Sequence, residues 1–143
     1  MAVEPLWAFY GFRTPARNEP IQEWFDERDD DVRDEIRDQL RYHENIERHL
    51  WTRPVFDKLG GEGISEFRFK ISGAAYRMYG DDGPGRHQYT FLHADDKTVR
   101  NDRPGKRIAK TRKGQLERKE ASVHEFRWKE DTDQEAPKGK GGT

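Results

Sequence analysis

The sequence of 143 residues contains no cysteine, and only 31% of its residues are hydrophobic. The lack of cysteine excludes a disulfide framework, a thiolate metal site and a cysteine nucleophile. No apolar run approaches the roughly 18 residues that span a bilayer, and residues 1–10 carry no basic leader of the kind found in signal peptides. These absences predict a soluble, cytoplasmic protein with one small hydrophobic core and no membrane partner.

An excess of one charge is also absent, since the net charge is only −1. This balance conceals a strong asymmetry along the chain. Residues 23–47 contain eleven Asp or Glu against four Arg, whereas residues 97–119 contain ten Lys or Arg against two acids. The basic segment is either a surface that binds a polyanion or an ordinary solvated helix.

The first half of the chain predicts one strand and two helices. Residues 6–12 are apolar, aromatic and short, as expected of an opening strand. Ile21, Trp24 and Phe25 recur at helical spacing, and Val32, Ile36 and Leu40 then follow at i, i+4 and i+8. This pattern indicates a helix pair with one apolar side, and the second helix is expected to end near Leu50.

Alternation in the second half predicts a three-stranded antiparallel meander. Two sets of side chains alternate along this strand: Phe67, Phe69 and Ile71 face one way, and Glu66, Arg68 and Lys70 face the other. The strand is therefore expected to have one buried face and one solvent-exposed face. Two more strands are expected around residues 75–79 and 87–93, followed by a basic helix from Pro104 to about Ala121. The predicted fold class is α+β, with the N-terminal strand and helix pair packed on a small antiparallel sheet.

The expected domain covers residues 1–121, and residues 122–143 form a polar C-terminal tail. Within that tail, residues 123–128 alternate and suit one edge strand, and the chain from residue 129 onward is expected to be disordered.

The ordered set of segments resembles the RelE/ParE toxin superfamily, and within it the HigB-like, phage-derived branch. The resemblance rests on Val55-Phe56-Asp57-Lys58-Leu59-Gly60-Gly61, Glu66-Phe67-Arg68-Phe69-Lys70-Ile71 and Ala75-Tyr76-Arg77-Met78-Tyr79. It covers about residues 6–120. No single motif in it is specific, but the order of the motifs is moderately so.

The resemblance implies the toxin of a type II toxin–antitoxin pair. It further implies a RelE/ParE-like fold and, in many members, cleavage of mRNA, often on the ribosome. The basic residues of that activity would fall on Arg68, Lys70 and Arg77, with Lys97 as a further basic residue in the loop after the last strand of the sheet. The chain departs from the family pattern at Asp95-Asp96, where aromatic or basic residues are commoner, and it has no clear counterpart of the C-terminal catalytic tyrosine.

RNA needs no metal for cleavage, because its 2′-OH is an internal nucleophile. The enzyme must remove that proton, stabilise the phosphate charge and protonate the leaving oxygen. Guanidinium groups suit the second task, so Arg77 is the first candidate, with a structural ion pair to the acidic helices as the alternative. His93, His87, Lys70 and Lys97 are candidate proton carriers, with His93 the better placed of the two histidines. The alternative for His93, a polar loop histidine, is the commoner case. The catalytic candidates are Arg68, Lys70, Arg77, His93 and Lys97.

Other cations would position RNA through its phosphates. These candidates are Arg86, His87, Arg100, Arg103, Lys106, Arg107, Lys110 and Lys113. The basic helix would serve equally well to bind an acidic antitoxin segment.

No metal and no cofactor are expected, because His43 and His49 are six residues apart and do not share a helix face.

Two functions therefore remain open. The first is a metal-independent mRNA endonuclease (mRNA interferase) whose partners are RNA, the ribosome and a cognate antitoxin. The second is a non-catalytic binder of the same fold, such as a gyrase-directed toxin or a phage protein that sequesters a host partner.

Overall fold

The computed structural model describes residues 4–96 and 101–128. The elements follow in the order β1 (Ala8–Arg13), α1 (Pro20–Asp26), α2 (Asp30–Glu44), the 3₁₀ helix η1 (Arg48–Leu50), β2 (Phe56–Asp57), β3 (Ser65–Ile71), β4 (Ala74–Asp82), β5 (Gln88–Asp96), α3 (Arg103–Glu117) and β6 (Ser122–Glu125). The α+β class is thus confirmed. None of the helices in the described part of the chain combines the length and apolarity needed to cross a bilayer.

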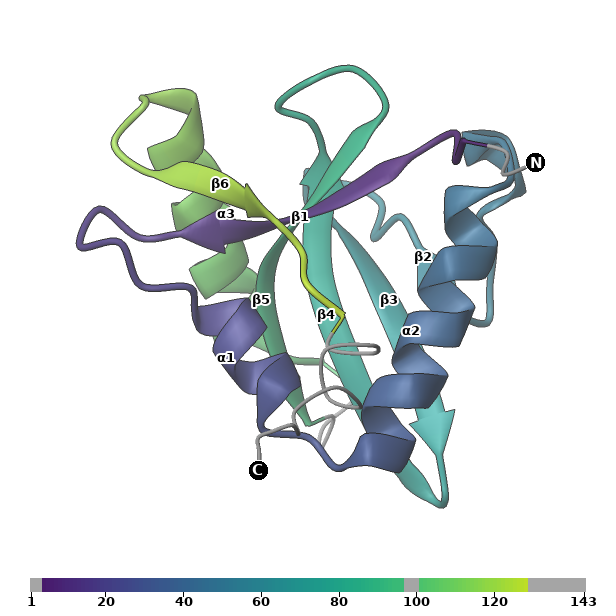
Figure 1. Ribbon diagram of the computed structural model, residues 1–143. Helices are drawn as coiled ribbons and strands as arrows, with labels where there is room; N and C mark the ends of the chain where they lie inside the picture. Colours follow the sequence, from purple (N-terminus) through teal and green to yellow (C-terminus); the bar gives the residue numbers. More distant parts are fainter. Residues whose placement is uncertain (1–3, 97–100, 129–143) are drawn as a thin grey trace, which may run out of the picture.

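The six strands form one sheet in the order β2-β3-β4-β5-β1-β6 (Figure 1). The sheet is mixed, because β1 pairs with β5 in parallel while the other neighbours are antiparallel. The expected antiparallel meander is confirmed for β3, β4 and β5, but the sheet as a whole is mixed. Short turns force β3, β4 and β5 to alternate in direction, but two helices separate β1 from the meander, so no hairpin fixes its direction.

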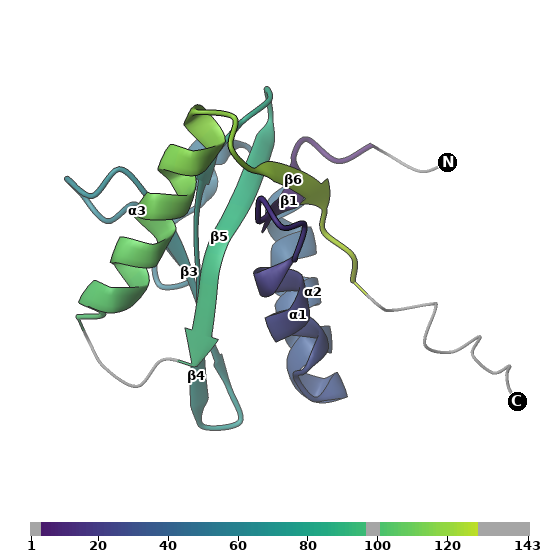
Figure 2. The ribbon, with the colours of Figure 1, turned by 90° about the vertical axis from the view of Figure 1, so that its left-hand side faces the viewer.

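Helices lie on both faces of this sheet. Figure 2 shows the sheet nearly edge-on, with α3 on one side and α1 and α2 on the other. The expected apolar stripe of α2 is buried, since Ile36 and Leu40 have no exposed surface. Phe67 and Phe69 of β3 are buried with them. The core therefore lies between the helix pair and the sheet, and α3 covers part of the opposite face.

Two helices end before the residues expected from the sequence. α2 ends at Glu44, and the side-chain amide of Asn45 then donates to the carbonyl of Arg41 at 2.8 Å. α3 ends at Glu117 instead of near Ala121, because Lys119 has a φ of 61°, which an α-helix does not accommodate.

The packed chain extends past residue 121. β6 pairs with β1 at the edge of the sheet, and Phe126 is only 6% exposed. The side-chain carbonyl of Gln22 accepts from the backbone N–H of Arg127 at 2.9 Å, which attaches this segment to α1. The expected disorder from residue 129 onward lies outside the described residues.

Candidate functional site

The face of the sheet that carries α3 holds a grid of polar side chains. The strand registers set Glu66, Tyr79 and His93 in one row across β3, β4 and β5. The next row holds Arg68, Arg77 and Asp95, and Lys70 follows on β3. The predicted set Arg68, Lys70 and Arg77 therefore shares one face, opposite the helix pair.

Arg77 occupies the centre of the grid and is buried, with 2% of its surface exposed. Its guanidinium lies 3.3 Å from Asp95, 3.7 Å from Asp102 and 3.9 Å from Glu66. A buried cation of this kind is stable only when carboxylates compensate its charge. Arg77 therefore joins three acidic side chains from three elements, and its partners are not the acidic helix pair considered above.

Asp102 attaches the beginning of α3 to this cluster. Its Oδ1 accepts from the backbone N–H of Gly105 at 3.1 Å, which caps the helix, and its Oδ2 accepts from the Tyr79 hydroxyl at 3.2 Å. Burial acts to raise the pKa of Asp102, but the Gly105 amide and the charge of Arg77 outweigh it and hold the pKa below its ordinary value. Burial raises the pKa of Tyr79, so its hydroxyl stays a neutral donor.

His93 and Asp95 form a pair at the exposed rim of the cluster. The Nε2 atom of His93 lies 3.1 Å from Oδ2 of Asp95, and their side chains are 18% and 34% exposed. The imidazole also stacks on the ring of Tyr79, with centroids 6.2 Å apart and an angle of 11° between the planes. No described residue makes a hydrogen bond to the other ring nitrogen.

The two cations of β3 differ in how firmly they are held. Arg68 donates to Oδ2 of Asp57 at 2.5 Å, with Glu66 3.3 Å from its Nε. Burial acts to raise the pKa of Asp57, but the Leu59 amide and the charges of Arg53 and Arg68 lower it, so Asp57 stays ionised. Lys70 is exposed, and no described residue pairs with it. Among the predicted catalytic cations that the structure describes, Lys70 is therefore the least constrained.

A second group of predicted cations follows α3. A hollow of about 480 Å³ is lined by Glu62, Asn101, Arg103, Lys106, Arg107, Lys110 and Thr111. Glu62 pairs with Lys106 and Lys110, whereas Arg103 and Arg107 are exposed and unpaired among the described residues. Four cations against one carboxylate make this hollow strongly basic.

The remaining predicted residues lie elsewhere. Arg86 and His87 are exposed in the β4–β5 turn, seven and six positions along the chain from His93, or at least about 20 Å at about 3.3 Å per residue. Lys113, near the end of α3, pairs with Asp81 at 2.9 Å. Lys97 and Arg100 lie outside the described residues, so their place relative to the site is not described.

The sequence reading missed Glu66, Tyr79, Asp95 and Asp102 as members of the site. The strand alternation predicted the correct face for Glu66, but it did not indicate that a helix covers this face. The one available signal for Asp102 was its position before Pro104, where an aspartate is a common helix cap.

The carboxylates of the cluster surround Arg77. In residues 4–96 and 101–128, no three His, Asp or Glu side chains are grouped so that they would hold a metal ion. A scan against models of protein families, a search of curated proteins and a search of solved structures each returned no match for this chain.

Proposed function

We propose that the protein is a RelE/ParE-like toxin that cleaves RNA without a metal on the α3-side face of the sheet. The observation that carries this proposal is the partly exposed His93–Asp95 pair on the same face as Arg68 and Lys70. β3 and β5 are two strands apart, or about 10 Å at about 4.8 Å per strand. A short segment of RNA backbone bridges that distance.

His93 is the proton carrier of the proposed reaction. Its imidazole accepts the proton of the RNA 2′-OH while that oxygen attacks the adjacent phosphorus. The bond from phosphorus to the 5′ oxygen then breaks, and that oxygen takes a proton from water, which leaves a 2′,3′-cyclic phosphate and a 5′-hydroxyl. His93 returns the proton of the 2′-OH to solvent. Asp95 orients the imidazole, and Arg68 and Lys70 bind the phosphate oxygens.

Arg77 is a positioning residue in this scheme and does not contact substrate. Its Nε lies 3.3 Å from Asp95, so it fixes the carboxylate that orients His93. The cations that line the α3 hollow supply contacts to neighbouring phosphates, which fix the register of the strand without reading its sequence.

Incubation of purified protein with free RNA and with ribosome-bound mRNA tests this function. We expect cyclic phosphate ends, and at least about 100-fold slower cleavage in His93→Gln, the loss typical of a missing general base. His49→Gln is the matched control, since His49 is exposed and also lies beside a carboxylate, Glu47, at 3.4 Å. Equal rates in the two variants would remove His93 from the mechanism.

A second function is favoured by the burial of Arg77 and by the contact between Arg68 and Asp57. In both cases a cation that would bind substrate phosphate is already paired with a carboxylate. This suits a protein of the same fold that binds a partner without cleaving RNA. If the wild-type protein arrests growth but leaves both RNA substrates intact, the binder, such as a gyrase-directed toxin or a phage protein that sequesters a host partner, is the better description.

A further inference from the structure

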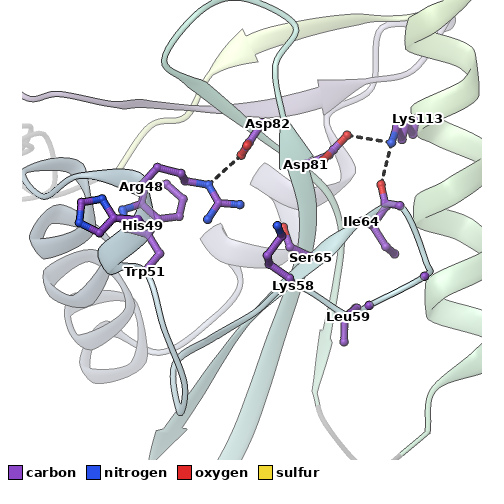
Figure 3. Close-up of a pocket in the computed structure, with 13 residues that line it drawn as sticks. Arg48, His49, Trp51, Lys58, Leu59, Ile64, Ser65, Asp81, Asp82 and Lys113 are labelled. Carbon is purple, nitrogen blue, oxygen red and sulfur yellow. Dashed lines mark hydrogen bonds and ion pairs between the residues drawn. The ribbon is translucent and has the colours of Figure 1, made fainter.

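A second hollow lies away from the proposed cleavage site, between η1 and α3. It measures about 970 Å³ and is lined by η1, the loop of residues 58–63 and the ends of β3 and β4 (Figure 3). Arg48 lies on one side and Lys113 on the other, with Lys58 and Ser65 between them. Three cations from three segments therefore converge on one space.

Two of these cations are fixed in direction. The guanidinium of Arg48 lies 4.9 Å from the ring centre of Trp51 and 4.5 Å from that of Phe56, and its Nε donates to Asp82 at 3.1 Å. Lys113 donates to the carbonyl of Gly63 at 2.6 Å and pairs with Asp81. Fixed side chains lose little freedom when they bind a ligand.

Several donors of the hollow remain available. No described residue accepts from the Nη atoms of Arg48, and none pairs with Lys58, which is exposed. Arg48, Lys58 and Lys113 carry three positive charges against the two of Asp81 and Asp82, so an excess of positive charge is left. Each carboxylate already has a cation, so the unused donors favour an anion.

The loop that forms one wall adds backbone geometry typical of anion sites. Leu59, Gly61 and Gly63 have φ values of 51°, 81° and 77°, and the residues between them do not. Alternating handedness of this kind is typical of the concave nests of backbone N–H groups that bind phosphate. The N–H groups of Leu59 and Glu62 are already used, by Oδ1 of Asp57 and the carbonyl of Leu59, so those of Gly60, Gly61 and Gly63 are the candidates for an anion. A side chain on Gly60 or Gly61 would meet nothing within 4 Å, so the loop leaves room beside its backbone.

We propose that this hollow is a phosphate-binding site, separate from the cleavage face, with Lys58 and the Nη groups of Arg48 as its main ligands. Phosphate fits both the donor set and the size of the hollow, which exceeds a single anion and admits a phosphate that carries a sugar or a chain. The phosphate is either a terminal monoester or a phosphodiester within an RNA strand. The site does not depend on RNA cleavage.

Amide chemical shifts of the full-length protein test this site without any reaction. Three probes are titrated: inorganic phosphate, and single-stranded 2′-O-methyl RNA of about eight nucleotides with a 5′-phosphate or with a 5′-hydroxyl. We expect the amides of Gly60, Gly61 and Gly63 to shift with at least one probe. Shifts with inorganic phosphate and the 5′-phosphorylated strand identify a terminal monoester, and equal shifts with both strands identify the internal backbone.

Lys58→Gln should weaken that binding by about tenfold, as expected for the loss of one charge-assisted hydrogen bond. Arg17→Gln removes the same charge from the exposed β1–α1 loop and should leave the affinity unchanged. The proposal is overturned if no probe shifts the three glycine amides, or if Lys58→Gln binds as tightly as Arg17→Gln. Failure of RNA cleavage would leave this result unaffected.

Discussion

Arg77, in the middle of β4, lies 3.7 Å from Asp102, the residue that caps α3. This contact connects the centre of the sheet to the only described helix on that face. Glu66 and Asp95 also lie within 3.9 Å of the guanidinium. Removal of Arg77 would leave buried carboxylates without a compensating charge, which is a large penalty in a protein interior.

Arg77→Ala should therefore lower the free energy of unfolding by about 3–5 kcal/mol. Urea denaturation followed by circular dichroism measures this change. Arg68→Ala, in the same row of the grid, should cost about 1 kcal/mol or less, because Arg68 is 35% exposed and its pair is partly solvated. Equal losses in the two variants would contradict a supporting role for Arg77. Because Arg77→Ala is expected to destabilise the fold strongly, lost activity in that variant would not identify a catalytic residue.

Substitution by alanine at two glycines of α3 should change the stability of the protein in opposite directions. A Cβ on Gly105 would collide with the side chain of Asp102 and approach Cε2 of Tyr79 to 3.0 Å. Gly105→Ala should thus destabilise the protein by about 1–3 kcal/mol, as overpacking does, although alanine favours helices.

Gly114→Ala is the matched control in the same helix. Its nearest neighbour would be the flexible end of Arg118 at 3.0 Å, which can move aside. The gain in helix propensity should then stabilise the protein by up to about 1 kcal/mol. Thermal melts of both variants measure whether the melting temperature falls or rises. A higher melting temperature for Gly105→Ala would show that Asp102 does not pack against α3 as described.

Two buried histidines should make the protein less stable in mild acid. Burial lowers the pKa of both His43 and His124 below the ordinary 6.5. The unfolded chain therefore binds protons more readily than the folded one, so stability is full above pH 6.5 and falls as the pH drops below it. Melting temperatures measured from pH 7.5 to 5 should decline, and His43→Gln should reduce the slope while exposed His49→Gln does not.

The elements that local patterns determine could be predicted from the sequence. The alternation of Phe67 and Phe69 with Arg68 and Lys70 gave the faces of β3 correctly, and the spacing of Ile36 and Leu40 gave the buried side of α2. Both signals depend only on the period of the backbone, which is a local property.

The burial of Arg77 could not be predicted in the same way. Its neighbours in sequence indicate an alternating strand, in which a cation normally faces water. Its burial depends on Asp102 and Gly105, which come from another element and arrive over β4 only when α3 folds back onto the sheet. The parallel pairing of β1 with β5 could not be predicted for the same reason. No hairpin joins those strands, so only the tertiary fold sets their relative direction.

The basic side of α3 leads to a prediction about salt. Arg103 and Arg107 are exposed, line one hollow and have no ion-pair partner among the described residues. If they contact RNA phosphates, each releases counterions on binding, and each contributes about 0.7 to the slope of log affinity against log salt for a single strand. The double variant Arg103→Gln/Arg107→Gln should therefore reduce that slope by about 1.4 in binding assays over a series of salt concentrations. The control is Arg17→Gln/Arg41→Gln, which removes the same charge from the β1–α1 loop and from α2 and should leave the slope unchanged. Equal slopes in the two double variants would show that RNA does not bind to α3.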